Sequence, residues 1–131
     1  LPNETALDAW TEMLKLSQKR GLPTYLGVTK RHRPDKFLIS HALDGFSLAF
    51  DFKITNNNRT KLSEMVQDFD KIALDAGGRF YFAKNSETAP ETAHQYLGDE
   101  TIKTFRKLKE RCDPQNLLYS DLYERVFAPL N

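Results

Sequence analysis

Strict alternation in the middle of the chain constrains the fold most. Every second residue from 46 to 54 is apolar, so that Phe46, Leu48, Phe50, Phe52 and Ile54 alternate with Ser47, Ala49, Asp51 and Lys53. A period of two is typical of a β-strand with one packed face and one polar face. The pattern therefore predicts a sheet that is covered by other elements on one side.

Amphipathic helices are predicted before and after this strand. Apolar residues recur at helical spacing over 4–20 and over 62–76, and Gly77-Gly78 ends the second pattern. Further strands are predicted over 24–30 and 79–84, whereas 37–40 fits a short strand or an extended loop. A helix start is expected at Pro90, and another helix over 100–111 with its inward residues Ile102, Phe105, Leu108 and Cys112. Ser120 can cap a last short helix.

The order of these elements predicts an α+β fold. We expect a mostly antiparallel sheet with helices packed on one face, in a ferredoxin-like order that lacks its first strand, followed by C-terminal helices. One edge of the sheet is then open, and we expect a missing strand or a partner chain to cover it. With 131 residues and no linker or repeat, 1–131 is expected to be a single domain. A start at Leu1-Pro2 without methionine is expected of a processed piece or a trimmed chain.

Composition excludes several classes of function. Nineteen basic residues face 18 acidic ones, which gives no broad electrostatic case for nucleic acid or an anionic membrane. One cysteine, Cys112, excludes an internal disulfide framework and indicates a reducing compartment, so we expect a cytoplasmic protein, with a peripheral position at a membrane left open. No apolar run reaches the roughly 20 residues of a transmembrane helix. The three histidines stand far apart without companion ligands, so no metal site is predicted.

The remaining candidates for chemistry lie at strand ends and on polar strand faces. Lys84 ends an aromatic strand that also carries Tyr81. Such a lysine is either a solvated strand end or a fixed positive charge, which would stabilise the negative charge of a reduced flavin. Tyr81 either packs in the sheet or offers its phenol to the same ring. Lys30, at the end of the first strand, is likewise either a solvated charge or a contact to the substrate. The strand face with Ser47, Ala49, Asp51 and Lys53 is either a cavity wall or plain solvated surface.

The basic run from Lys30 to Arg33 suggests a second class of function. RNA-recognition domains share the ferredoxin-like order and stack bases on aromatic residues of the open sheet face. Here the phenylalanines share one continuous face, as in a core, and the aromatic RNA-binding sequence pattern is missing. A stand-alone ferredoxin-like module that binds RNA, protein or a small ligand stays as the alternative.

Several short motifs, taken in order, resemble one enzyme family. They are Tyr25–Lys30, Gly45–Phe52, Gly77-Gly78-Arg79, Tyr81, Ala83-Lys84, Asp113-Pro114 and Ser120-Asp121. The chain resembles the C-terminal part of FAD-linked oxidoreductases of the vanillyl-alcohol-oxidase superfamily, most of all the decaprenylphosphoryl-ribose oxidases and aldonolactone oxidases. The resemblance extends over nearly the whole chain.

The resemblance implies that 1–131 is the C-terminal substrate or cap portion of a larger flavoenzyme. FAD would be bound mainly by an N-terminal half, in the same or a neighbouring polypeptide. Tyr81 and Lys84 would approach the flavin, with Lys84 catalytic, and Lys30, Ser47, Ala49 and Asp51 would contact the substrate. The implied reaction oxidises a CH–OH group of a sugar or polyol, and reduction of an isoprenoid or sterol double bond is the second possibility. The ribose oxidases carry asparagine at the position of Ser47 and cysteine at that of Ala49, which leaves the substrate open.

Overall fold

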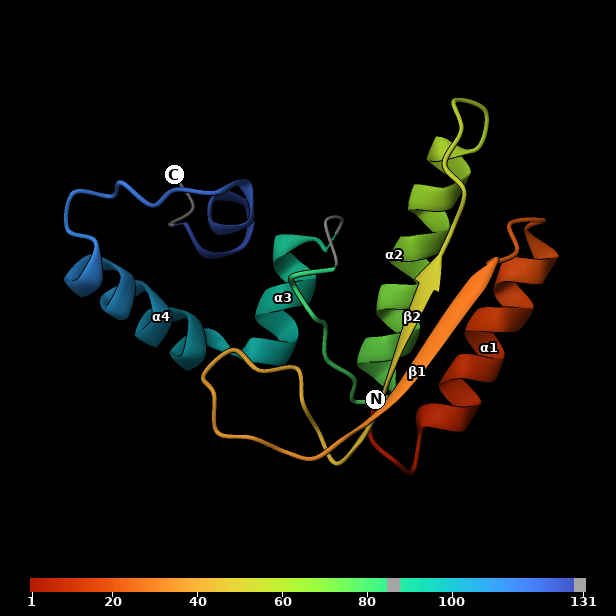
Figure 1. The fold of residues 1–131 in the computed structure, drawn as a ribbon, viewed down its shortest axis with the longest axis horizontal. Helices are drawn as coiled ribbons and strands as arrows, with labels where there is room; N and C mark the ends of the chain where they lie inside the picture. Colours follow the sequence, from red (N-terminus) through yellow and green to blue (C-terminus); the bar gives the residue numbers. More distant parts are fainter. Residues whose placement is uncertain (85–87, 129–131) are drawn as a thin grey trace. The chain divides into compact units, whose positions relative to one another are not determined.

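The computed structural model describes residues 1–84 and 88–128, which form two compact units. The first unit contains Leu1–Asp35 and His41–Arg79, and the second contains Lys36–Ser40 and the described part of 80–131 (Figure 1). The first unit carries the sheet and two long helices. The second unit consists of helical elements joined by loops.

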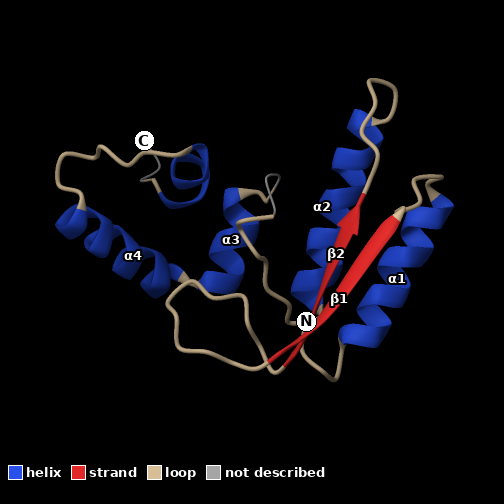
Figure 2. Cartoon of the chain, viewed as in Figure 1, coloured by secondary structure: helices blue, strands red, loops and turns tan. Residues whose placement is uncertain are grey.

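Two antiparallel strands form the sheet of the first unit, drawn as red arrows in Figure 2. Strand β1 (Leu26–His32) pairs with β2 (Gly45–Asp51), with Gly27 opposite Phe50, Thr29 opposite Leu48 and Arg31 opposite Phe46. Both strands were predicted from their sequence patterns. The pairing carries β1 two residues beyond Lys30, while β2 stops one residue before Phe52.

Both helices of this unit contact the apolar face of β2. Trp10 of α1 (Ala6–Lys19) packs edge-on against Phe46, with 5.8 Å between ring centroids. Phe69 of α2 (Arg59–Asp75) lies 5.9 Å from Phe50 and 6.2 Å from Phe52. The alternation of β2 thus puts its aromatic rings under the helices, and the predicted α+β fold with an antiparallel sheet is confirmed. The buried apolar residues of this unit are Ala6, Ala9, Met13, Ala42, Leu62, Met65, Phe69 and Ala73.

The second unit is built on α3 (Pro90–Leu97), α4 (Asp99–Cys112) and the π-helical turn η1 (Tyr123–Phe127). Its core cluster consists of Ala93, Val126 and Phe127, with Phe82 and Phe105 packed against it. Ser120 accepts a hydrogen bond from the backbone N–H of Tyr123 at 3.2 Å, as predicted for the cap of the last helix. None of the described helices is long and apolar enough to cross a membrane.

The strand predicted over 79–84 is wrong. Gly77, at φ +71°, ends α2, and the N–H of Gly78 then donates to the carbonyl of Ala73 at 2.7 Å. The carbonyl of Phe80 accepts a hydrogen bond from the hydroxyl of Tyr96 at 3.2 Å, and 82–84 form a turn. The segment is therefore held by side-chain packing on α3 and by no strand ladder. The stretch 37–40, left open by the sequence, is also a turn.

Two of the four residues of α4 that were predicted to face inward do so. Ile102 is buried and Phe105 packs on the core cluster, but Leu108 is 40% exposed and Cys112 is exposed. The core cluster of this unit is small, and neither Leu108 nor Cys112 packs against it. Cys112 is consequently a surface thiol and no packed core residue.

Candidate functional site

The sheet face turned away from the helices gathers the four residues predicted to contact substrate. Residues directly opposite each other in an antiparallel pair share a face, and Lys30 lies opposite Ser47, Val28 opposite Ala49 and Leu26 opposite Asp51. Their partners in the alternation, such as Phe46 and Phe50, point to the helices. Lys30, Ser47, Ala49 and Asp51 therefore lie on one surface, which we call the open face.

One residue of the open face was missed by sequence reasoning. His32 follows Lys30 by two positions on β1, and its Nε2 lies 2.7 Å from the Oγ of Ser47. Its ring also meets that of His41 edge-on, with 5.1 Å between centroids. The signal that could have identified His32 was the period of β1, because Leu26, Val28, Lys30 and His32 share one parity. An imidazole hydrogen-bonded to a hydroxyl is a group that can accept or pass on a proton.

His41 extends this cluster from the loop that precedes β2. Burial, and then the neighbouring His32 imidazole, lower the pKa of His41, while the carboxylate of Asp35 acts in the opposite direction. His41 is therefore held toward its neutral form, in which one ring nitrogen can accept a hydrogen bond.

The open face changes character along its length. Lys30, His32 and Ser47 make one end polar, and Val28, which is 39% exposed, lies with Ala49 in the middle. Leu26, 48% exposed, and Asp51 lie at the far end. Ser47 and Ala49 have small side chains, so the open face is lower at these two positions than at the longer side chains beside them. A ligand with a hydroxylated group and an apolar extension matches this order of side chains.

Tyr81 and Lys84 belong to the second unit. They lie in the segment that was expected to be a strand, where the N–H of Lys84 closes a turn onto the carbonyl of Tyr81 at 3.0 Å. Phe80 and Phe82 fix this segment by packing on Tyr96, at 5.5 and 5.9 Å between centroids. Tyr81 is 51% exposed and Lys84 is exposed. The structure thus joins the four substrate candidates on one face and keeps Tyr81 and Lys84 as a separate pair.

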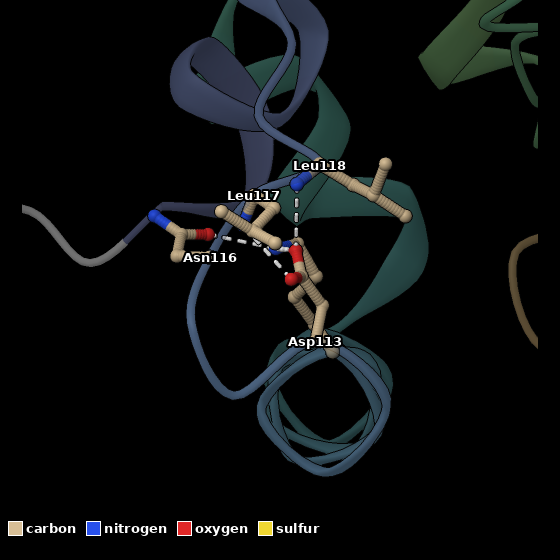
Figure 3. A network of polar contacts seen from close by, with 5 residues as sticks. Asp113, Asn116, Leu117 and Leu118 are labelled. Atoms are coloured by element: carbon tan, nitrogen blue, oxygen red, sulfur yellow. Dashed lines mark hydrogen bonds and ion pairs between the residues drawn. The ribbon is translucent and has the colours of Figure 1, made fainter.

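A network around Asp113 orders the loop that follows α4 (Figure 3). One carboxylate oxygen accepts from the N–H of Leu117 at 2.8 Å, and the other accepts from the N–H of Leu118 at 2.9 Å. Lys109 pairs with the same carboxylate and donates to the side-chain oxygen of Asn116 at 2.7 Å. The helix ends at the predicted Asp113-Pro114 break, and the loop holds Leu117 and Leu118 at 76% and 78% exposure.

Replacing Asp113 by asparagine is expected to loosen this loop. Lys109 lowers the pKa of the Asp113 carboxyl, burial opposes this, and the N–H groups of Leu118 and Leu117 lower it further. A lowered pKa means that the network is intact above the ordinary carboxyl range and is lost as pH falls through the folded-state value. An amide offers one oxygen where the carboxylate offers two, so Asp113→Asn should speed amide hydrogen exchange at Leu117 and Leu118 by about tenfold at neutral pH.

The matched control for this variant is Asp121→Asn, at an exposed carboxylate of the same unit. It should leave the exchange of both leucine amides unchanged. Equal exchange rates in Asp113→Asn and the parent protein would contradict the role given to the carboxylate.

The described residues do not offer a complete cofactor or metal site. They contain no group of three or more His, Cys, Asp or Glu side chains that could hold a metal ion. Gly98, the glycine that opens a helix, precedes Asp99 and Glu100, whose charges would repel a pyrophosphate at the start of α4. The exposed ammonium of Lys84 and phenol of Tyr81 are donors suited to the edge of a flavin ring. The described residues therefore show no site for the phosphates of FAD, and a role of Lys84 and Tyr81 toward its ring stays a prediction.

Comparison with known proteins relates the chain to an oxidase. No family model matches the chain. Over 127 residues, 96% of this chain, it is 28% identical to decaprenylphosphoryl-beta-D-ribose oxidase of Mycolicibacterium smegmatis. This likeness relates the chain to an oxidoreductase. The chain spans about a quarter of the length of that relative, as the aligned residues are 26% of it. The sequence-based expectation of an oxidoreductase relationship is confirmed, and the finer assignments stay predictions.

Proposed function

We propose that residues 1–131 form the C-terminal substrate-binding portion of an FAD-dependent oxidoreductase that oxidises a CH–OH group of a sugar or polyol. The observation that carries this proposal is the alignment with a ribose oxidase along 96% of the chain. It is supported by the register of β1 and β2, since that register puts Lys30, Ser47, Ala49 and Asp51 on one face. The main FAD site would lie in an FAD-binding portion of the same or a neighbouring polypeptide.

In this proposal Lys84 and Tyr81 act toward the flavin ring. Bound flavin supplies the acceptor for the hydride that leaves the substrate carbon. The ammonium of Lys84 would stabilise negative charge on the ring, and the phenol of Tyr81 would donate a hydrogen bond to the ring or to the substrate. Both residues are exposed on the second unit.

The open face would bind the substrate and receive its proton. Oxidation of the alcohol breaks a C–H bond, whose hydride goes to the flavin, and an O–H bond, whose proton goes to a base. We propose that this base is His32, with Ser47 holding the substrate hydroxyl beside it, because their side chains lie 2.7 Å apart. Lys30 lies opposite Ser47 in the strand pairing and would bind a further oxygen of the substrate.

The apolar middle of the open face suggests that the substrate also has an apolar portion. The name of the ribose oxidase relative describes a ribose joined through phosphate to a decaprenyl group. We propose a substrate of the same general kind, in which the hydroxylated group lies at Lys30 and Ser47 and an apolar chain runs past Val28 and Ala49. Reduction of an isoprenoid double bond would use the apolar middle but would need no base at His32.

Replacing Lys84 tests the flavin role in the FAD-loaded holoenzyme. Lys84→Ala is expected to slow anaerobic flavin reduction by about 100-fold, since one charge-stabilising contact is lost. The flavin reduction potential should fall as well, because the negative charge of the reduced ring loses its counter-charge. Lys107→Ala, at an exposed lysine of α4, is the control and should change neither quantity.

Replacing His32 tests the substrate role in the same holoenzyme. His32→Ala should slow reduction by about 100-fold with an unchanged flavin potential, and added imidazole should restore part of the rate. A slow variant that imidazole does not rescue would remove His32 as the base. Unchanged rates in both variants would reject the proposed function and leave the stand-alone ferredoxin-like module as the better explanation.

A further inference from the structure

The first residues of the chain already pair with the sheet on the edge of β2 that faces away from β1. The terminal amino group of Leu1 donates to the carbonyl of Phe46 at 2.7 Å, and the N–H of Phe46 donates back to the carbonyl of Leu1 at 2.9 Å. The N–H of Asn3 donates to the carbonyl of Asp44 at 3.1 Å, and Pro2 lies opposite Gly45 in an antiparallel bridge. These bonds are those of the end of an antiparallel strand that leads into α1.

The same edge of β2 continues beyond this pairing. Backbone groups alternate between the two edges of a strand, so Leu48 and Phe50 present their N–H and C=O to the same side as Phe46. Within residues 1–84 and 88–128 no group hydrogen-bonds to the backbone of Leu48 or Phe50 on this edge. An open edge beside half-buried apolar side chains is a position where a further strand adds.

We propose that the free edge of β2 at Leu48 and Phe50 accepts one more antiparallel strand, supplied by polypeptide joined directly to Leu1. The register follows from the bridge that is present. The second and fourth residues upstream of Leu1 would lie opposite Leu48 and Phe50 and point to the helices. The first and third would lie opposite Ser47 and Ala49, on the open face, and would extend it sideways.

Gly45 shows that the edge is shaped for a closely approaching strand. A Cβ at this buried glycine would overlap the carbonyl oxygen of Leu1 and come within 3.0 Å of the N of Asn3. The close approach of two backbones is a place where glycine is required. At Gly27 on β1, by contrast, a Cβ would have only the side-chain ring of Phe50 within 4 Å and no backbone atom.

Two observations favour the same polypeptide over a second copy of the chain. A chain that continues back from Leu1 meets Leu48 and Phe50 in register without a turn, whereas a second copy would have to pair beside Leu1–Asn3. The position of the Leu1 nitrogen also suits a peptide N–H better than an ammonium. Burial lowers the pKa of this amino group, and an uncharged N–H would make the bond to Phe46 without the cost of burying a charge.

Amide hydrogen exchange tests this proposal without any cofactor. The chain is extended before Leu1 by the five residues Thr-Val-Thr-Val-Thr, which put valine opposite Leu48 and Phe50. The matched control is Thr-Pro-Thr-Pro-Thr, which removes the N–H donors at those two positions. The valine extension should slow exchange at Leu48 and Phe50 by about tenfold or more relative to the proline extension. The amides of Ser47 and Ala49, which face β1, should not change.

Adding Gly45→Val to the valine extension should abolish the gain in protection. Equal exchange at Leu48 and Phe50 in the two extensions would overturn the proposal. Protection that rises with protein concentration, together with a dimer in size-exclusion chromatography, would assign the edge to a second copy and also overturn it. These outcomes do not depend on flavin, so they are separate from those that test the proposed function.

Discussion

Phe127→Ala is expected to destabilise the second unit by about 3–5 kcal/mol, the usual cost of deleting a buried phenylalanine ring. Phe127 is 2% exposed. Its ring lies 4.3 Å from that of Phe105 and 5.7 Å from that of Phe82, measured between centroids. Ala93 and Val126 are the other buried members of the cluster, and neither is large enough to fill the space left by the ring.

The loss should reach the segment that carries Tyr81 and Lys84 through Phe82. This residue packs on both Phe127 and Tyr96, and it stands between Tyr81 and Lys84 in the sequence. Without the Phe127 ring, the turn that presents Tyr81 and Lys84 loses one of the two aromatic contacts of Phe82 and keeps the one with Tyr96. In urea unfolding followed by NMR, the amides of Ala93 and Val126 should lose protection at a lower urea concentration in Phe127→Ala.

Leu117→Ala is the matched control for this variant, because it removes an apolar side chain from the same unit at a position that is 76% exposed. It should shift the transition by less than about 0.5 kcal/mol. Equal effects of the two substitutions would mean that the cluster around Phe127 contributes little to the stability of the unit.

Asp70→Asn should stabilise the first unit at neutral pH. Asp70 lies on α2 with 6% of its surface exposed, and burial raises the pKa of its carboxyl to about 6 from the ordinary value of 3.8. A raised pKa means that the folded state binds the proton more tightly than the unfolded state. The carboxyl therefore favours folding most below pH 3.8, and this contribution is lost as pH rises through about 6.

The size of the effect follows from the difference between the two pKa values. At about 1.4 kcal/mol for each tenfold change in proton affinity, Asp70→Asn should gain up to about 3 kcal/mol at pH 7. The gain should shrink toward zero near pH 4. Urea unfolding at several pH values, followed by the fluorescence of Trp10 in the same unit, measures it.

Asp75→Asn, at an exposed carboxylate at the end of the same helix, is the control and should show no such pH dependence. A gain in Asp70→Asn that is the same at pH 4 and pH 7 would contradict titration of Asp70 as its cause.

The first unit was predictable because its elements are encoded by local periods. The alternation from Phe46 to Phe52 determines which side of the sheet meets the helices, and the spacing of Leu62, Met65 and Phe69 gives the apolar stripe of α2. The open face followed from the same alternation. The place of His32 on it was not predicted, because the strand pairing decides that His32 lies beside Ser47.

The second unit was less predictable because its arrangement depends on contacts between distant residues. Phe80 and Phe82 alternate with polar or small residues as in a strand, but the structure has no strand there and both rings pack on Tyr96. A strand also needs a neighbour for its backbone, and local sequence does not reveal whether one exists. In the same way, the helical period of α4 does not indicate that the core ends before Cys112.

The way the chain passes between the two units limits how it can be dissected. The polypeptide leaves the first unit after Asp35, returns at His41 and leaves again after Arg79. No single cut can therefore yield two fragments that each contain one whole unit. A fragment that ends at Arg79 keeps Lys36–Ser40, which belongs to the second unit, and a fragment that starts at Phe80 lacks it. Expression of the first unit by itself thus calls for a redesigned connection between β1 and β2, with a short linker in place of 36–40.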